Sequence, residues 1–158
     1  MEQKILGIFL TLILALLGLI AFSDEIDGKM LRSVPSDPPK TVDFVDINQY
    51  LGKWYEQSVI PNFWENGCIK TTATYSLNED KTIKVQNHCI RNGKESGNTG
   101  KATPEDDTNA KLKLQFIQSL DISGHYWVVR LAKDYSYAAV SSPDYKYLFI
   151  LYREPIMP

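Results

Sequence analysis

The sequence predicts an all-β fold: an eight-stranded antiparallel up-and-down barrel. After residue 54 the apolar residues alternate with polar ones more often than they recur at helical spacing. The connections between these segments are short and polar, and we recognise no long crossover helix among them. Eight such strands can close on themselves, which removes the sheet edges and leaves an interior able to hold one small ligand.

The first 23 residues are interpreted as a signal peptide rather than as part of the barrel. In residues 5–22 Thr11 is the only polar side chain, Lys4 precedes this stretch, and the segment 21–23 suits a cleavage site. The alternative is an N-terminal membrane anchor, because eighteen apolar residues can just span a bilayer. Either way we expect an exported protein, periplasmic or secreted, or tethered to a membrane by residues 5–22.

Residues 24–46 are expected to form an extended arm, and residues 47–158 the barrel. The arm contains Pro35, Pro38 and Pro39 and has no steady hydrophobic period. Strands are expected at residues 54–60, 71–77, 83–90, 97–102, 111–116, 126–132, 137–141 and 147–152. The clearest case is 111–116, where Leu112, Leu114 and Phe116 share one face.

The two cysteines favour a disulfide across the second and third strands. With a turn at residues 78–81, Leu77 faces Thr82, and counting back places Cys68 opposite Arg91. A bulge or a loop adjustment would then bring Cys68 within bonding distance of Cys89. An even cysteine count in an exported chain also favours a bridge. The alternative is two separate buried thiols.

Composition excludes several classes of function. The 158 residues include 17 basic and 19 acidic side chains, a formal net charge of −2, which argues against a nucleic-acid partner. Two histidines and two cysteines are too few for a four-ligand Cys/His zinc site. Motifs for dinucleotides, nucleotide phosphates, zinc proteases and serine hydrolases do not occur. We therefore predict no catalytic residue, no metal and no cofactor.

Three motifs then resemble the lipocalin family. The segment from Gly52 through Trp54 to Glu56 is similar to the G-x-W-Y-E opening of the first lipocalin strand, Asp134-Tyr135 follows the sixth strand, and Arg153 follows the eighth. The surrounding sequence resembles the bacterial lipocalins and apolipoprotein D. Lipocalins usually carry a helix after the eighth strand, whereas this sequence reaches Pro158 shortly after Arg153, so we expect that helix to be missing.

Strand directions predict a structural role for these motif residues. In an up-and-down barrel Trp54, Tyr135 and Arg153 all fall at the same end. An Arg guanidinium stacked on the Trp ring would close that end. The loops at residues 61–70, 91–96, 117–123 and 143–146 then surround the opposite end. We expect Phe63 and Trp64 to border an opening there; the alternative is that they pack on the outside.

Strand alternation predicts which residues face the interior. The expected ligand-binding residues are Tyr75, Asn87, Leu112, Leu114, Phe116, Val129, Val140, Tyr147 and Phe149. The sixth strand is apolar on both faces; Trp127, Val129 and Leu131 are taken as inward because this leaves Arg130 outside. With the opposite parity Arg130 becomes a candidate carboxylate clamp. Glu56 is a further candidate near the cavity base.

The resemblance implies a binding protein. We expect it to bind, store or transport a fatty acid, a lysophospholipid or a similar amphiphile, in envelope lipid upkeep, as a monomer or dimer with membrane association. One alternative is an isomerase-like enzyme that uses Cys89 as a nucleophile, which requires that cysteine to be unbridged. Another is a tetrapyrrole carrier, ranked last because His88 and His125 are not expected to reach the cavity.

Overall fold

The computed structural model describes residues 35–116 and 123–158. The expected signal peptide or anchor, residues 24–34 of the expected arm, and most of the loop expected at residues 117–123 therefore lie outside the described residues. Within the described ranges, no helix is long and apolar enough to cross a membrane.

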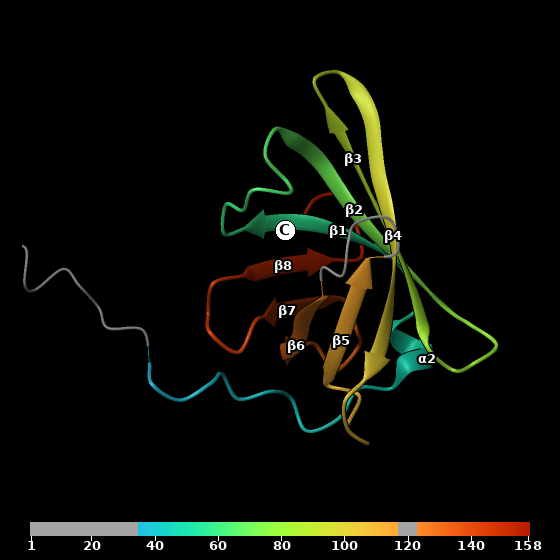
Figure 1. Ribbon diagram of the computed structural model, residues 1–158, viewed down its shortest axis with the longest axis vertical. Coiled ribbons are helices and arrows are strands. Elements are labelled where there is room, and N and C mark those ends of the chain that lie inside the picture. Colours follow the sequence, from blue (N-terminus) through green and yellow to red (C-terminus); the bar gives the residue numbers. More distant parts are fainter. Residues whose placement is uncertain (1–34, 117–122) are drawn as a thin grey trace, which may run out of the picture. The chain divides into compact units, whose positions relative to one another are not determined.

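The eight strands form a closed antiparallel barrel, which confirms the predicted fold class (Figure 1). Each strand pairs with the next in sequence, and β1 pairs with β8 to close the sheet. The elements are α2 Ile47–Tyr50, β1 Gly52–Val59, β2 Cys68–Leu77, β3 Ile83–Arg91, β4 Lys94–Pro104, β5 Lys111–Phe116, β6 Ser123–Leu131, β7 Tyr137–Ser141 and β8 Leu148–Tyr152.

The hairpin between β3 and β4 is tighter than the loop expected at residues 91–96. Asn92 and Gly93 both have positive φ angles, 52° and 73°, as a two-residue hairpin turn requires. The strands consequently pair all the way from Ile83 to Arg91, and β4 has 11 residues in place of the six expected. The Asn-Gly dipeptide is the sequence signal for this turn.

The disulfide joins Cys68 and Cys89, as predicted, with a Cα–Cα distance of 5.5 Å. Leu77 lies opposite Ile83, one residue away from the expected Thr82. An irregularity between Ile69 and Thr72 then shifts the register by one, so that Cys68 still lies opposite Arg91. The bridge therefore runs from Cys68 to a residue two positions away from its direct partner Arg91.

The parity expected for the sixth strand was wrong in its first half. Tyr126 and Val128 are buried, whereas Trp127 lies on the outer face with the Lys111 ammonium 5.0 Å from its ring centre. The register shifts between Val128 and Arg130, so Val129 occupies a bulge and the alternation changes phase there. This shift leaves Arg130 exposed, as expected, and it excludes the carboxylate clamp at that position.

Trp54 and Arg153 close one end of the barrel, as the motif spacing predicted. Trp54 is fully buried, and the Arg153 guanidinium carbon lies 3.9 Å from the centre of its ring. Arg153 donates hydrogen bonds to the carbonyl oxygens of Leu51 (2.9 Å) and Tyr135 (3.2 Å). Gly52 has a φ of +94°, and a Cβ there would lie 3.3 Å from the guanidinium, so glycine suits this position.

The last residues before α2 pack against the same end. Val45 is buried in the core, and Val42 packs beside it. The Val42 backbone N–H donates to the carbonyl of Val128 at 2.9 Å, and the Asp46 N–H donates to the Tyr135 hydroxyl at 2.9 Å. Contacts with the barrel thus begin within the segment expected to be an arm.

We predict that Trp54→Ala lowers the free energy of unfolding by about 3–5 kcal/mol, because it removes a fully buried aromatic ring. Urea denaturation followed by circular dichroism measures this change. Trp127→Ala is the matched control, since it removes a ring from the outer face and a cation–π contact worth about 1 kcal/mol. Equal losses in the two variants, or an altered ligand preference in Trp54→Ala, would contradict the assigned role of Trp54.

We also predict that replacing both cysteines by serine lowers the free energy of unfolding by about 3 kcal/mol. The two cysteines are 21 residues apart, and a bridge that closes a loop of this length restricts the unfolded chain. Ligand binding should remain measurable, since the bridge ties β2 to β3 near the mouth and shapes the rim of the cavity more than its apolar interior. Denaturation with and without a thiol reductant checks this: reductant should weaken the wild type and leave the serine variant unchanged. A wild type insensitive to reductant would refute the prediction.

Candidate functional site

A cavity of about 540 Å³ lies inside the barrel. Seven of the nine expected ligand-binding residues line it: Tyr75, Asn87, Leu114, Phe116, Val140, Tyr147 and Phe149. Leu112 faces inward but is buried in the core nearer the Trp54 end. Val129 does not line the cavity, because the β6 bulge replaces it with Tyr126. Alternation predicted the inward face but not how deep each side chain lies.

A chain of tyrosine hydroxyls forms the base of the cavity. Tyr126 exchanges hydrogen bonds with Tyr75 at 2.9 Å and with Tyr50 at 2.8 Å. The Tyr50 ring in turn packs 4.8 Å from the Trp54 ring, centre to centre. Burial raises the pKa of Tyr75 to about 12, and it raises the pKa values of Tyr50 and Tyr126 well above the ordinary value. All three hydroxyls at this end of the cavity are therefore uncharged.

Phe116 illustrates how the backbone of a neighbouring strand makes room for a lining residue. Gly100 of β4 lies opposite Phe116 of β5 in the sheet. A Cβ at Gly100 would come within 2.9 Å of the Phe116 ring. The absent side chain therefore lets the ring lie against β4 while it lines the cavity.

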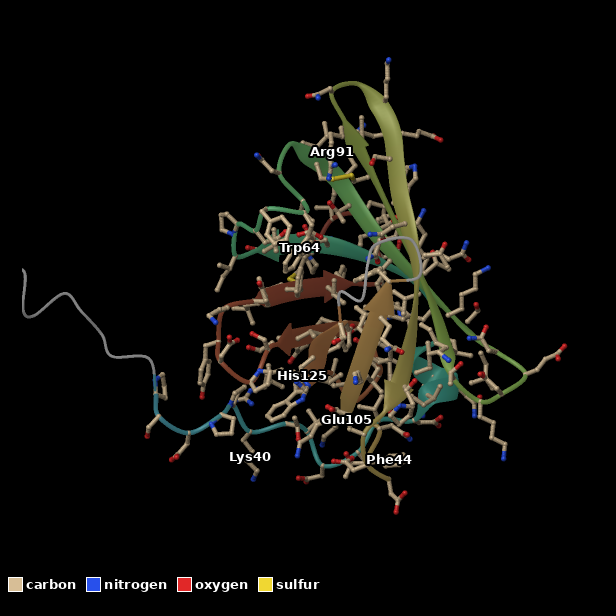
Figure 2. All side chains as sticks on the ribbon, viewed as in Figure 1. Lys40, Phe44, Trp64, Arg91, Glu105 and His125 are labelled. Atoms are coloured by element: carbon tan, nitrogen blue, oxygen red, sulfur yellow. A yellow bond between two sulfur atoms is a disulfide. The ribbon has the colours of Figure 1, made fainter. Side chains whose placement is uncertain are left out.

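The segment at residues 60–67, here called the mouth loop, contributes aromatic side chains to the cavity. Phe63 and Trp64 both line it, and Phe63 is 76% exposed. The Trp64 ring lies 4.6 Å from that of Tyr147, and the Trp64 carbonyl accepts a hydrogen bond from Arg91 (Figure 2). The expectation that these aromatics border the opening fits this geometry.

Two carboxyl groups also line the cavity. Glu56 comes from β1, and Glu65 comes from the mouth loop, where its carboxylate accepts a hydrogen bond from the Asn62 side chain at 2.6 Å. Burial is the main cause that raises the pKa of Glu56 to about 7; the charge of Glu65 and a hydrogen bond to it add to the effect. Glu56 was a candidate from strand parity, whereas Glu65 was missed because loop conformation decides where it points.

Contrary to expectation, His88 and His125 are among the residues that line the cavity, and each lies beside an acidic partner. His88 Nε2 is 3.8 Å from Glu95, and His125 Nδ1 is 3.4 Å from Glu105. About half of each histidine side chain is exposed. In the part of the chain that the structure covers, no group of three His, Cys, Asp or Glu residues could hold a metal ion.

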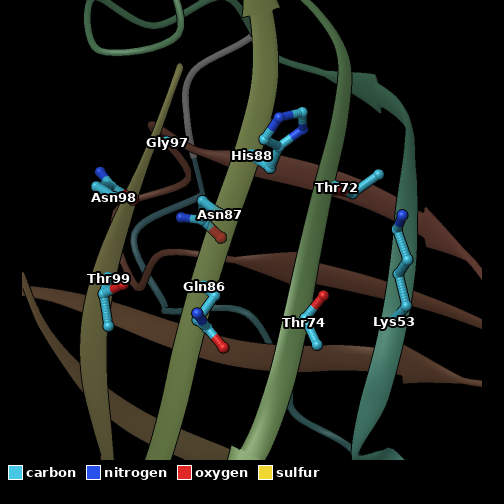
Figure 3. Close-up of a pocket in the computed structure, with 9 residues that line it drawn as sticks. All are labelled: Lys53, Thr72, Thr74, Gln86, Asn87, His88, Gly97, Asn98 and Thr99. Atoms are coloured by element: carbon cyan, nitrogen blue, oxygen red, sulfur yellow. The ribbon is translucent and has the colours of Figure 1, made fainter. Parts of the chain in front are cut away.

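A second hollow of about 550 Å³ lies on the outer face of strands β1 to β4 (Figure 3). Its Thr74 and Gln86 alternate with the inward-facing Tyr75 and Val85. This hollow is lined by threonine, amide and other polar side chains. We favour the interior cavity as the ligand site, because apolar side chains from opposite sides of the barrel converge there.

The sheet topology and the motif residues Trp54, Tyr135 and Arg153 at the closed end indicate one protein family. A family model described as a lipocalin-like domain matches residues 45–158. The chain belongs to the lipocalin family. The three motif segments around Trp54, Tyr135 and Arg153 all fall within the matched region.

Several curated lipocalins are similar in sequence. Apolipoprotein D from Cavia porcellus is 39% identical over 87% of this chain and 70% of its own length. The outer membrane lipoprotein Blc from Citrobacter freundii is 40% identical over 75% of this chain and 69% of its own length. Temperature-induced lipocalin-1 from Arabidopsis thaliana is 37% identical over 69% of this chain, which spans 63% of that relative.

Solved structures agree on the fold. Insecticyanin from the tobacco hornworm Manduca sexta superposes with a TM-score of 0.61 at 22% identity, covering 80% of this lipocalin and 71% of its own chain. At this identity the likeness concerns the barrel alone.

We predict that the stability of this lipocalin falls as the pH rises from about 4.5 to about 7 through Glu56. In this window the carboxyl of the unfolded chain has released its proton, whereas the carboxyl of the folded chain retains it. The free energy of unfolding therefore decreases as the pH rises, until the folded carboxyl also ionises. Glu56→Gln should remove this component and be more stable than the wild type above pH 7, as measured by urea denaturation across the window.

Glu65→Gln provides the comparison for that experiment. It removes the neighbouring negative charge and should move the upper limit of the window to lower pH without removing the effect of burial. A Glu56→Gln variant with the wild-type pH profile would show that Glu56 is not the group responsible.

Proposed function

We propose that this lipocalin binds a single-chain amphiphile, a fatty acid or a lysophospholipid, in the barrel cavity. The observation that carries the proposal is the convergence of Val85, Leu114, Val140 and Phe149, from four different strands, on one cavity. Its volume of about 540 Å³ lies within the range of about 300–1,000 Å³ typical of small-molecule sites. The apolar walls would hold an acyl chain, and its polar end would lie among the polar side chains at the mouth end of β3.

The name of one relative supports a place in the cell envelope, and the name of another supports a role in lipid handling. One similar protein is an outer membrane lipoprotein and another is an apolipoprotein. We therefore propose storage or transport of the amphiphile in the cell envelope or in the secreted phase, by a monomer or dimer that associates with a membrane. Export by a signal peptide at residues 1–23, or tethering by residues 5–22, belongs to the same proposal.

Catalysis by a cavity cysteine required a free thiol. Cys89 lines the cavity, but both cysteines of the chain form the disulfide. A tetrapyrrole carrier would use His88 or His125 to hold the tetrapyrrole. Their rings instead lie beside the carboxylates of Glu95 and Glu105, which does not favour this alternative. Binding without chemistry is therefore the function that this geometry supports best.

We predict that Leu114→Trp weakens binding of a long acyl chain more than tenfold. The larger side chain would displace about three methylenes, at about 0.8 kcal/mol each, or roughly 2.4 kcal/mol in total. Titration with a fluorescent fatty-acid analogue measures the change.

Lys113→Trp is the matched control, because Lys113 is the next residue along β5 and is exposed. It should bind the analogue like the wild type. Circular dichroism of both variants checks that the barrel folds. Equal effects at the two positions, with both variants folded, would contradict binding inside the barrel.

A further inference from the structure

Arg91 is the one lysine or arginine among the described residues that line the cavity. It is the last residue of β3, opposite Cys68, and it lies at the same end of the barrel as the mouth loop (Figure 2). A cation in this position can meet the head of an amphiphile whose chain extends into the barrel.

The guanidinium is only partly satisfied by the protein. Its Nη2 donates to the Trp64 carbonyl and lies 3.3 Å from the Cys68 sulfur. Its Nε is buried and has no hydrogen-bond partner in the described protein. Among those same residues no carboxylate comes within the 4.0 Å that defines an ion pair with Arg91. Because protein atoms cover Nε, a ligand would meet the guanidinium through Nη1, which makes no hydrogen bond within the described residues and can donate to an anionic oxygen.

The other charged groups of the cavity oppose an anion. Glu56 and Glu65 line its β1 side, and an anionic head next to them would be repelled whenever either is ionised. The base of the cavity offers the hydroxyls of Tyr75 and Tyr126, which already bond to each other. An anionic head is therefore disfavoured deep in the barrel and beside β1, and is favoured at Arg91.

We propose that Arg91 determines the headgroup specificity of the cavity by binding the anionic oxygens of an amphiphile, a carboxylate or a phosphate, at the mouth. This inference rests on the proposed function, because it assumes that the acyl chain occupies the interior. The chain then runs from Arg91 towards Tyr75 and Val85. Arg91 thus takes the role of carboxylate clamp that sequence parity had left open for Arg130.

The test compares three chain-matched probes on the wild type and on Arg91→Gln: palmitic acid, 1-palmitoyl lysophosphatidic acid and hexadecanol. Displacement of a fluorescent fatty-acid analogue is followed first, and direct calorimetry confirms each affinity. Because charge-assisted hydrogen bonds are lost, Arg91→Gln should weaken at least one of the two anionic probes about tenfold or more. Binding of hexadecanol should change by less than about twofold, since the substitution leaves the contacts between its apolar chain and the cavity walls unchanged. The probe that weakens identifies the headgroup: carboxylate, phosphate or both.

Lys94→Gln is the matched control. Lys94 pairs with Arg91 across the hairpin but does not line the cavity, so this variant removes the same charge from the same end without altering the cavity wall. It should leave all three affinities near the wild-type values. Equal weakening by Lys94→Gln would show general electrostatic attraction and overturn the assignment.

Three further outcomes separate the failures. If Arg91→Gln weakens hexadecanol as much as the anionic probes, Arg91 only holds the mouth loop through Trp64, and the headgroup role is wrong. If it weakens none of the probes that the wild type binds, the headgroup role is wrong while the proposed function stands. If the wild type binds none of the three, the proposed function itself fails.

Discussion

The stacking of Arg153 on Trp54 is the contact on which the architecture depends. One guanidinium covers the ring and donates to carbonyls of Leu51 and Tyr135, which belong to segments far apart in the chain. It thereby joins the end of β8 to the start of β1 and to the loop between β6 and β7, where the barrel must close. Because Trp54 and the neighbouring tyrosines seal this end, the cavity opens at the end that carries the mouth loop.

Much of this arrangement follows from local rules that act on the sequence alone. Alternation of apolar and polar residues located all eight strands, and the strand directions placed Trp54, Tyr135 and Arg153 at one end. The disulfide was predictable because pairing across a short turn fixes which residues can meet. Seven of the nine expected cavity residues line the cavity, since side-chain direction in a regular strand has a strict period of two.

The errors arose where the period breaks or where depth matters. The bulge at Val129 cannot be read from a strand that is apolar on both faces, so Trp127 was placed inside. Leu112 has the right direction but lies too near the Trp54 end to line the cavity. Glu65 and Arg91 were missed because their roles depend on how the mouth loop folds and on which donors it leaves unpaired. Neither property has a period in the sequence.

The bulge in β6 also divides that strand into two segments of opposite phase. Tyr126, before it, lines the cavity, whereas Leu131, after it, packs against the core without lining the cavity. A substitution in the first segment can reshape what the cavity accepts without disturbing the packing of the second. Conversely, deletion of the extra residue would bring both segments into one phase and exchange inner for outer side chains on one side of the break. A single inserted residue thus decides which side chains of β6 line the cavity.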